Sequence, residues 1–263
     1  MHTIISTLHF PWDTIDDCCR IAREELGLDG VELSLHDSWS HPHCTPADLL
    51  RLPMLRERYG LSLDAHIWED IARLGVEAGT TALLGWLDAC RSAGINGVVI
   101  HGGSFDDRVD GITRTRQTLQ RVLPAFEHAR VVLKLENHYA FGYHDCRELF
   151  SEPWEFLEVL SLNSPSLRCC FDTGHGHMTN NWSALLHELS PWLSHVHLAD
   201  NGGIDDDHLP FRRGTVPWNA MFNVLGEIGF AGSYCIEFPV RDDQEPFRQC
   251  VAELSARAGI PRC

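Results

Sequence analysis

Residues 133–136, Leu-Lys-Leu-Glu136, form a short apolar run that ends in a side chain able to bind a metal ion. Five other runs have the same design, and successive run ends lie roughly 25–40 residues apart, the length of a strand–helix unit. Parallel strands joined by helices bring their carboxyl ends to one rim. We therefore expect six side chains to meet there, namely His66, His101, Glu136, Asp172, His197 and Glu237.

Strand and helix patterns alternate along the rest of the chain, which is typical of α/β proteins. Strands are expected at residues 3–8, 30–35, 61–67, 97–101, 131–136, 167–172, 194–198 and 233–238. Helices are expected near residues 14–26, after 46, at 80–93, 112–129, after 151, at 182–189, from 217 and at 245–258. Eight such units predict a single (β/α)8 TIM barrel over residues 1–263. A doubly wound sheet is the alternative, but it would gather ligands at one crevice rather than at six strand ends.

Composition limits the class of protein further. The chain has 263 residues, 44% of them hydrophobic, and no linker-like tract, which fits one domain with one core. Its net charge of −16 repels a phosphate backbone, so we expect no nucleic-acid partner. No apolar run reaches the ~18 residues of a membrane span, and we expect neither a membrane segment nor a signal peptide. Ten cysteines without a Cys-x-x-Cys pair suit reduced thiols in the cytoplasm.

Four of the strand ends form the most economical metal site: Glu136, Asp172, His197 and Glu237. Three carboxylates and one imidazole suit one divalent ion such as Mn²⁺, Co²⁺, Mg²⁺ or Zn²⁺. Without a cation, three carboxylates in one pocket would raise one another's pKa. The open positions of the ion could take two adjacent oxygens of a polyol or hydroxy-ketone. Glu136 and Glu237 could then move a proton beside the carbonyl, through an enediolate that the metal stabilises.

Further side chains are candidates for this site, although each taken alone would more often be a capping, packing or solvated group. Substrate hydroxyls or additional metal ions could be bound by His66, His101, His175, Asp206 and His208. The aromatic side chains just past two strand ends, Trp12 and Trp68, could line a pocket wall. The only lysine, Lys134, would lie beneath Glu136 and needs a carboxylate partner, which Asp64 or Glu32 could supply. Arg212 or Arg213 could bind a phosphate or carboxylate.

Four motifs together resemble the xylose isomerase-like TIM-barrel superfamily: Leu-Glu136-Asn-His, Phe-Asp172-Thr-Gly-His175, His195-Val-His197-Leu-Ala-Asp and Ile-Glu237-Phe. This superfamily includes sugar phosphate isomerases and epimerases, ketose 3-epimerases, inosose dehydratases and AP endonucleases of the endonuclease-four type. The resemblance covers nearly the whole chain. It implies a metal at Glu136, Asp172, His197 and Glu237, with the two glutamates as the acid and base. It also suggests a homodimer.

The resemblance leaves several activities open. Ketose 3-epimerases carry a further Glu six residues after the ligand on the fifth strand, and Gly142 occupies that position here. The endonuclease members use a larger ligand set for three zinc ions, and His66, His101, His175, Asp206 and His208 match it. We therefore expect an isomerase or epimerase of a small sugar-like substrate with one metal, or with two or three. A dehydratase, an AP-endonuclease-type phosphodiesterase and a polyol-binding barrel without turnover are the alternatives.

Overall fold

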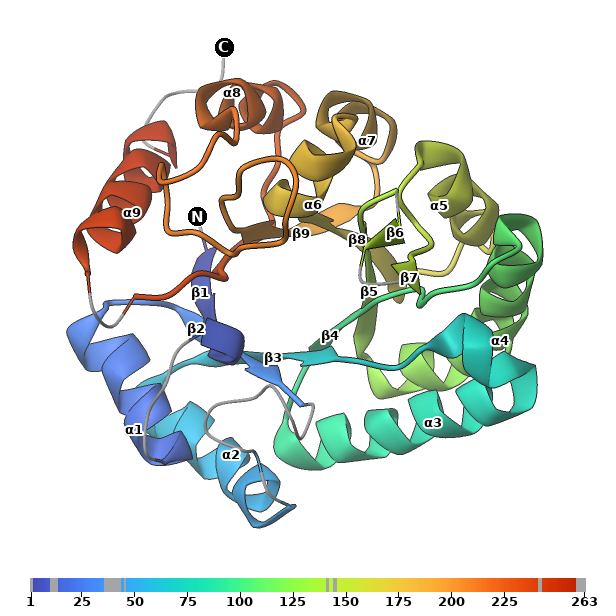
Figure 1. The fold of residues 1–263 in the computed structure, drawn as a ribbon. Helices are drawn as coiled ribbons and strands as arrows, with labels where there is room; N and C mark the ends of the chain where they lie inside the picture. The colour runs from blue at the N-terminus through green and yellow to red at the C-terminus, as the bar shows by residue number, and fades with distance from the viewer. Residues whose placement is uncertain are drawn as a thin grey trace.

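The strands form a closed parallel barrel, as the sequence predicts (Figure 1). The computed structural model describes residues 2–9, 14–35, 44, 46–140, 142–143, 146–240 and 243–258. Within these residues the order around the barrel is β1-β10-β9-β8-β5-β4-β3-β2. The strands are β1 (His2–Ser6), β2 (Gly30–Ser34), β3 (Ser62–Ile67), β4 (Gly97–Ile100), β5 (Val132–Glu136), β8 (Leu167–Asp172), β9 (Leu193–Leu198) and β10 (Ser233–Ile236).

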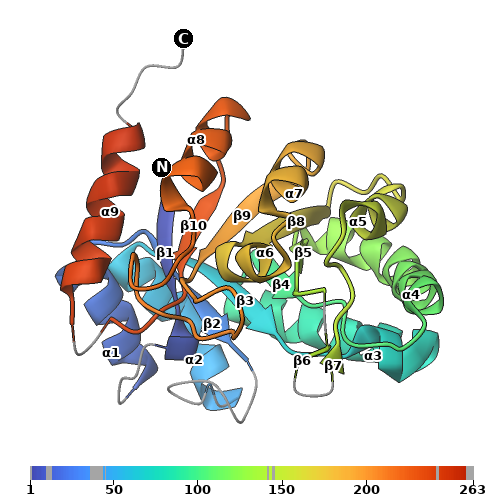
Figure 2. The same ribbon diagram turned by 45° about the horizontal axis from the view of Figure 1, so that its top comes forward.

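Helices surround the strands on the outside of the barrel (Figures 1 and 2). Side chains alternate along each strand, so Leu133 and Leu135 face outward when Lys134 and Glu136 face inward, and all four are buried. The helices are α1 (Ile15–Arg20), α2 (Pro46–Tyr59), α3 (Ile71–Ala93), α4 (Arg108–Ala129), α5 (Pro153–Leu160), α6 (Thr173–Thr179), α7 (Trp182–Glu188), α8 (Trp218–Glu227) and α9 (Glu245–Ala258), with short η1 (Thr7–His9) and a π-helical turn η2 (Ile21–Glu25). No helix in these described stretches is long and apolar enough to cross a membrane.

Two helices begin earlier than their apolar patterns predict. Helix α3 starts at Ile71 rather than near residue 80, because Asp70 caps it by accepting from the Arg73 backbone N at 3.1 Å. Its first turn ends at Gly75, where φ of 78° introduces a kink. Helix α4 likewise starts at Arg108, with Asp107 as its cap. Apolar spacing reports where a helix packs, whereas these polar caps determine where it starts.

Helix α6 and the hairpin of β6 (Gly142–Tyr143) and β7 (Cys146–Arg147) are not predicted by the sequence pattern. Helix α6 follows β8 without a loop, because Asp172 ends the strand and also caps the helix through a 2.6 Å bond from the His175 backbone N. Its two glycines obscure the helical pattern. They are needed for close packing, since a Cβ on Gly174 or Gly176 would lie only 2.9 Å from Asn201 Nδ2 or the Phe171 ring. The result is that His175 lies directly beside Asp172.

The long loop after β9 folds back on itself, as its polar composition allows. Asp200 closes it: one carboxylate oxygen accepts from the Val216 backbone N at 3.0 Å and the other accepts from Trp218 Nε1 at 2.8 Å. A backbone bridge joins Asp200 to Leu209. In Figure 2 this orange loop lies over the strand ends. The closure brings Asp206 and His208, at the turn of the loop, toward the rim.

Candidate metal centre

The four side chains expected to hold one metal converge at the rim of the barrel. Glu136 and Asp172 end β5 and β8, His197 is the last residue but one of β9, and Glu237 follows β10 directly. The strand register places Asp172 beside His197 and His197 beside Cys235, two residues before Glu237. One ligand atom from each of the four side chains lies within 4.8 Å of the other three. All four side chains are buried, so the barrel positions them with little freedom.

The chemistry of this group fits a divalent cation. His197 Nδ1 lies 2.9 Å from Glu237 Oε2 and 3.3 Å from Glu136 Oε1. Two further carboxylate oxygens, Glu136 Oε2 and Asp172 Oδ2, are buried without a hydrogen-bond partner among the residues that the structure describes. The pKa of Asp172 is raised to about 6, first by burial and then by the charges of Glu136 and Glu237, against the lowering effect of His175 and His197. A cation would satisfy the unpartnered oxygens and offset the mutual repulsion of the carboxylates.

Without a metal, the imidazole holds the two glutamates ionised. Burial alone raises the pKa of Glu136 and of Glu237, but the charge of His197, followed by other histidines, lowers both below the ordinary glutamate value. Burial lowers the pKa of His197, but Cys170 and then the carboxylates of Glu237 and others raise it well above the ordinary value. A metal that binds His197 Nδ1 must therefore displace a proton, and its affinity will depend on pH.

His66 and His101 form a second group against the same glutamate. Their Nε2 atoms lie 3.0 Å apart, and they are 3.3 Å and 3.2 Å from Glu136 Oε2. These three side chains can offer ligand atoms to one ion. Trp68 stacks on His66 with ring centroids 5.2 Å apart, where a pocket wall is expected. The other expected wall residue, Trp12, lies outside the described residues.

His175, Asp206 and His208 form a third group at the same rim. Asp206 Oδ2 lies 3.2 Å from His175 Nε2, and Asp206 Oδ1 lies 3.4 Å from His208 Nε2. Each histidine turns its Nδ1 to a backbone carbonyl at 2.9 Å, on Asn137 and Glu237 respectively. A carbonyl can only accept, so each Nδ1 carries a proton, and the Asp206 carboxylate also only accepts, so each Nε2 carries a second proton until a metal displaces it. Displacement leaves each ring with its Nδ1–H held by a carbonyl and its Nε2 lone pair free to bind the ion. That is the arrangement of a metal-binding histidine.

Several residues of the site have no clear signal in the sequence. His138 stacks on His175 with ring centroids 4.2 Å apart. Ser6 Oγ donates to Glu237 Oε1 at 3.2 Å. The alternation of side chains along a strand could have indicated His138, because it lies two residues after Glu136. Ser6 ends β1 as the ligands end their strands, but a serine there is common without a functional role.

The layer beneath the rim is also charged. Lys134 Nζ lies 2.6 Å from Asp64 Oδ2. Of the two partners that the sequence allows, Asp64 and Glu32, Lys134 therefore pairs with Asp64. Glu32 instead lies against two histidines, with Oε2 3.0 Å from His195 Nε2 and Oε1 2.9 Å from His197 Nε2. All of these groups are buried or nearly so. Charged residues therefore continue from the rim into the interior of the barrel.

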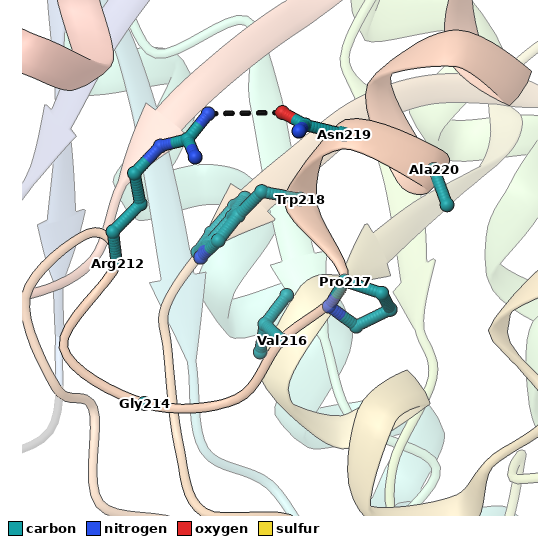
Figure 3. A pocket seen from close by; sticks show the side chains of 7 residues that line it. All are labelled: Arg212, Gly214, Val216, Pro217, Trp218, Asn219 and Ala220. Atoms are coloured by element: carbon teal, nitrogen blue, oxygen red, sulfur yellow. Dashed lines mark hydrogen bonds between the residues drawn. The ribbon is translucent and has the colours of Figure 1, made fainter.

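A separate hollow lies beside the start of α8, and none of its lining residues belongs to the rim groups (Figure 3). Arg212 lies there, but Asn219 Oδ1 accepts from its guanidinium at 2.9 Å and Glu253 lies 3.7 Å away. Arg213 pairs with Asp243 at 3.3 Å. Both arginines, which the sequence offers for a phosphate or carboxylate, thus already contact acidic side chains of the protein.

Comparison with known proteins identifies similar barrels. A family model described as "Xylose isomerase-like TIM barrel" matches residues 21–257. The protein MJ1311 of Methanocaldococcus jannaschii, described as uncharacterized, is 25% identical over 214 residues, 74% of this chain and 70% of that one. A D-tagatose 3-epimerase-like protein superposes with a TM-score of 0.81 at 21% identity, covering 98% of both chains. D-psicose 3-epimerase from Clostridium cellulolyticum H10 superposes with a TM-score of 0.78 at 15% identity, covering 100% of both.

Proposed function

The chain belongs to the xylose isomerase-like TIM barrel family, and from this premise we propose that it is a metal-dependent isomerase or epimerase of a sugar, sugar phosphate or polyol-like substrate. The observation that carries the proposal is the convergence of Glu136, Asp172, His197 and Glu237, with ligand atoms within 4.8 Å of one another. Solved barrels of similar fold are named as a D-tagatose 3-epimerase-like protein and as a D-psicose 3-epimerase. At 15–21% identity this likeness concerns the fold, so the sugar class is part of our proposal.

In this proposal Glu136 and Glu237 carry the proton. One carboxylate removes the proton from the carbon beside the substrate carbonyl, and the other returns it. Glu136, Asp172, His197 and Glu237 would hold a divalent ion, which would supply charge stabilisation for negative charge that develops on the substrate oxygens. His66 lies between the two glutamates, with Nε2 3.3 Å from Glu136 and Nδ1 3.6 Å from Glu237. It can hold both carboxylates in place or contact a substrate hydroxyl.

The remaining expectations are part of the same proposal. We place the protein in the cytoplasm, with support from eight described cysteines that are all free thiols. We propose that residues 1–263 act as one domain and as a homodimer. Trp68, beside His66 and His101, is proposed to line the wall of the substrate site.

A dehydratase of an inosose-like substrate is the near alternative, because the same enediolate can expel a neighbouring hydroxyl. The distant alternative is a phosphodiesterase with two or three metals, and the His66–His101–Glu136 and His175–Asp206–His208 groups favour it. The net charge of −16 opposes binding of DNA. A nicking assay on an abasic duplex over a range of salt concentrations separates this alternative from sugar chemistry.

The first experiment measures metal content and stoichiometry on protein purified without added metal. About one Mn, Co, Mg or Zn per chain supports the four-ligand site. A screen of ketoses and inososes in deuterated water then tests the reaction: deuterium in the recovered sugar supports isomerisation, and a dehydrated product supports the lyase. Two or three metals per chain would favour the phosphodiesterase alternative over the isomerase or epimerase. Turnover that survives complete removal of the metal would exclude the proposal.

A further inference from the structure

A line of buried polar groups runs from the lower layer of the barrel to the proposed metal ligand His197. Asp64 Oδ2 lies 2.6 Å from Lys134 Nζ, which lies 3.0 Å from His195 Nδ1. His195 Nε2 lies 3.0 Å from Glu32 Oε2, and Glu32 Oε1 lies 2.9 Å from His197 Nε2. Glu32 and both histidine rings have no exposed surface.

The donors and acceptors in this line of groups determine which nitrogen of each histidine carries the proton. The Lys134 ammonium can only donate, so the His195 Nδ1 facing it must accept, and the proton of the neutral His195 ring is on Nε2. That Nε2–H faces one oxygen of Glu32, and the other oxygen faces His197 Nε2. A carboxylate only accepts, so an attractive contact requires a proton on His197 Nε2 as well. When a metal takes the place of the other proton, the Nδ1 lone pair of His197 points at Glu136 and Glu237.

We propose that Glu32 is a positioning residue that fixes His197 with Nδ1 toward the metal, and that Lys134 acts through His195 to fix the orientation of Glu32. This inference rests on the proposed metal centre. Both imidazole contacts of Glu32 are short, at 3.0 Å and 2.9 Å, although among the described residues its only hydrogen bond is the one that Oε1 accepts from Cys235 Sγ at 3.6 Å. Glu32, His195, His197 and Cys235 could in principle hold an ion themselves. The Lys134 ammonium beside His195 opposes that reading, because it already places a positive charge there.

Replacing Glu32 with glutamine separates a positioning role of Glu32 from a role as a direct metal ligand. Glutamine has one acceptor oxygen where glutamate has two. Because Lys134 fixes the proton of His195 on Nε2, the amide oxygen must turn to His195 and the amide NH₂ must face His197. His197 Nε2 then has to accept, its proton moves to Nδ1, and the metal loses a ligand. Removing Lys134 frees His195 to accept at Nε2, so the amide can turn round and restore His197.

The experiment is a metal titration of chelator-treated protein with Zn²⁺ by calorimetry. It compares four proteins: wild type, Glu32→Gln, Asp64→Asn/Lys134→Met, and the combination of all three substitutions. Glu32→Gln is expected to weaken binding by about 10- to 100-fold in the wild-type background, as loss of a partner behind a ligand does. In the Asp64→Asn/Lys134→Met background the same substitution should weaken zinc binding by about 3-fold or less. Circular dichroism melting confirms that each protein is folded.

A second readout needs no variant. In zinc-loaded wild type, ¹⁵N shifts of the imidazole nitrogens should show the proton on Nε2 in both His195 and His197, and a proton on Nδ1 of either ring overturns the proposal. Equal losses from Glu32→Gln in both backgrounds also overturn it, because they make Glu32 merely structural. Loss of a second zinc equivalent alone would make Glu32 a ligand instead. A wild type that binds no zinc would remove the metal centre itself, which distinguishes that failure from a failure of the positioning role.

Discussion

The side chain of Glu237 contacts three surrounding groups. Ser6 Oγ donates to it at 3.2 Å, His197 Nδ1 lies 2.9 Å away and His66 Nδ1 lies 3.6 Å away. Glutamine at this position keeps the shape and one acceptor oxygen but cannot take a proton. We therefore expect Glu237→Gln to fold, to keep much of its metal, and to lose about 10²- to 10⁴-fold in turnover.

Deuterium incorporation from solvent, measured together with metal content, checks this prediction. Glu188→Gln at the exposed end of α7 is the matched control, since it makes the same chemical change away from the rim. Undiminished deuterium incorporation by metal-loaded Glu237→Gln would show that Glu237 does not transfer the proton.

The Asp206–His208 pair predicts how the metal-free protein responds to pH. Burial lowers the pKa of His208, but Asp206 outweighs this and raises it to about 9. Burial raises the pKa of Asp206, but His175 and then His208 lower it well below the ordinary value of 3.8. The raised histidine contributes stability that is complete below pH 6.5 and is lost as pH rises through 9. The depressed carboxyl contributes stability that is complete above pH 3.8 and is lost as pH falls below that value.

The free energy of unfolding of metal-free protein should therefore be highest between about pH 4 and 6.5. The shift of His208 from 6.5 to about 9 corresponds to roughly 3 kcal/mol, which should disappear on the alkaline side. Denaturant unfolding at a series of pH values measures this, with His208→Gln as the comparison. A decline toward pH 9 of equal size in His208→Gln would assign the effect to another group.

At the residue scale, the sequence predicts which side chains meet at the rim but not which residues would orient them. His66, Asp172 and Glu237 each end an apolar run, and that position is readable because the run marks the strand. Glu32 lies within a strand, where a carboxylate has no pattern to mark its partner. Its contacts with His195 and His197 depend on how far three strands are staggered around the barrel, and hydrophobic alternation leaves that stagger undetermined.

At the element scale, Arg108 joins the start of α4 to the start of α5. Its guanidinium donates to Glu155 Oε1 at 2.7 Å, to Ser151 Oγ at 2.6 Å and to the Glu148 carbonyl at 2.9 Å. The Glu155 side chain is fully buried and also accepts from the backbone N of Ser151 and Glu152. Removing the arginine would leave a buried carboxylate without its cation.

We expect Arg108→Met to lower the free energy of unfolding by about 3 kcal/mol. Arg114→Met is the control on the same helix, because its partner Asp110 is an exposed side chain four residues away and such pairs contribute about 0.5 kcal/mol or less. Urea unfolding of both variants decides the matter. If Arg108→Met and Arg114→Met lose similar amounts, the buried pair does not join the two helices as described.

The elements themselves divide into those that hydrophobic pattern reveals and those that polar contacts create. All eight barrel strands and the body of each long helix follow from apolar spacing. The early starts of α3 and α4 depend on Asp70 and Asp107, and an aspartate before a helix is too common to fix the start by itself. Helix α6 depends on packing against Phe171 and Asn201, which belong to other parts of the fold. Its sequence, with two glycines in seven residues, disfavours a helix in isolation.

At the scale of the whole molecule, the proposed metal should stabilise the folded barrel, because the unfolded chain has no preformed group of carboxylates. A ligand that binds only the folded state at a hundred times its Kd adds about 2.7 kcal/mol. We expect the melting temperature to fall on treatment with a chelator and to rise again when Mn²⁺ or Zn²⁺ is restored. Asp172→Asn, which keeps the fold but removes one ligand charge, should reduce the rise in melting temperature that the metal produces. A melting temperature that does not respond to metal in wild type would argue against a site at the rim.

The single lysine of this chain is Lys134, and only 6% of its surface is exposed inside the barrel. Reagents that acylate amines therefore find no accessible lysine side chain on the folded protein. The α-amino group at the amino terminus is the other amine that they can modify. Covalent labelling of Lys134 would require the barrel to open, so the rate at which Lys134 is labelled reports how often the barrel opens. The mass increase at this one position, followed over time, would measure how often the charged interior of the barrel is exposed to solvent.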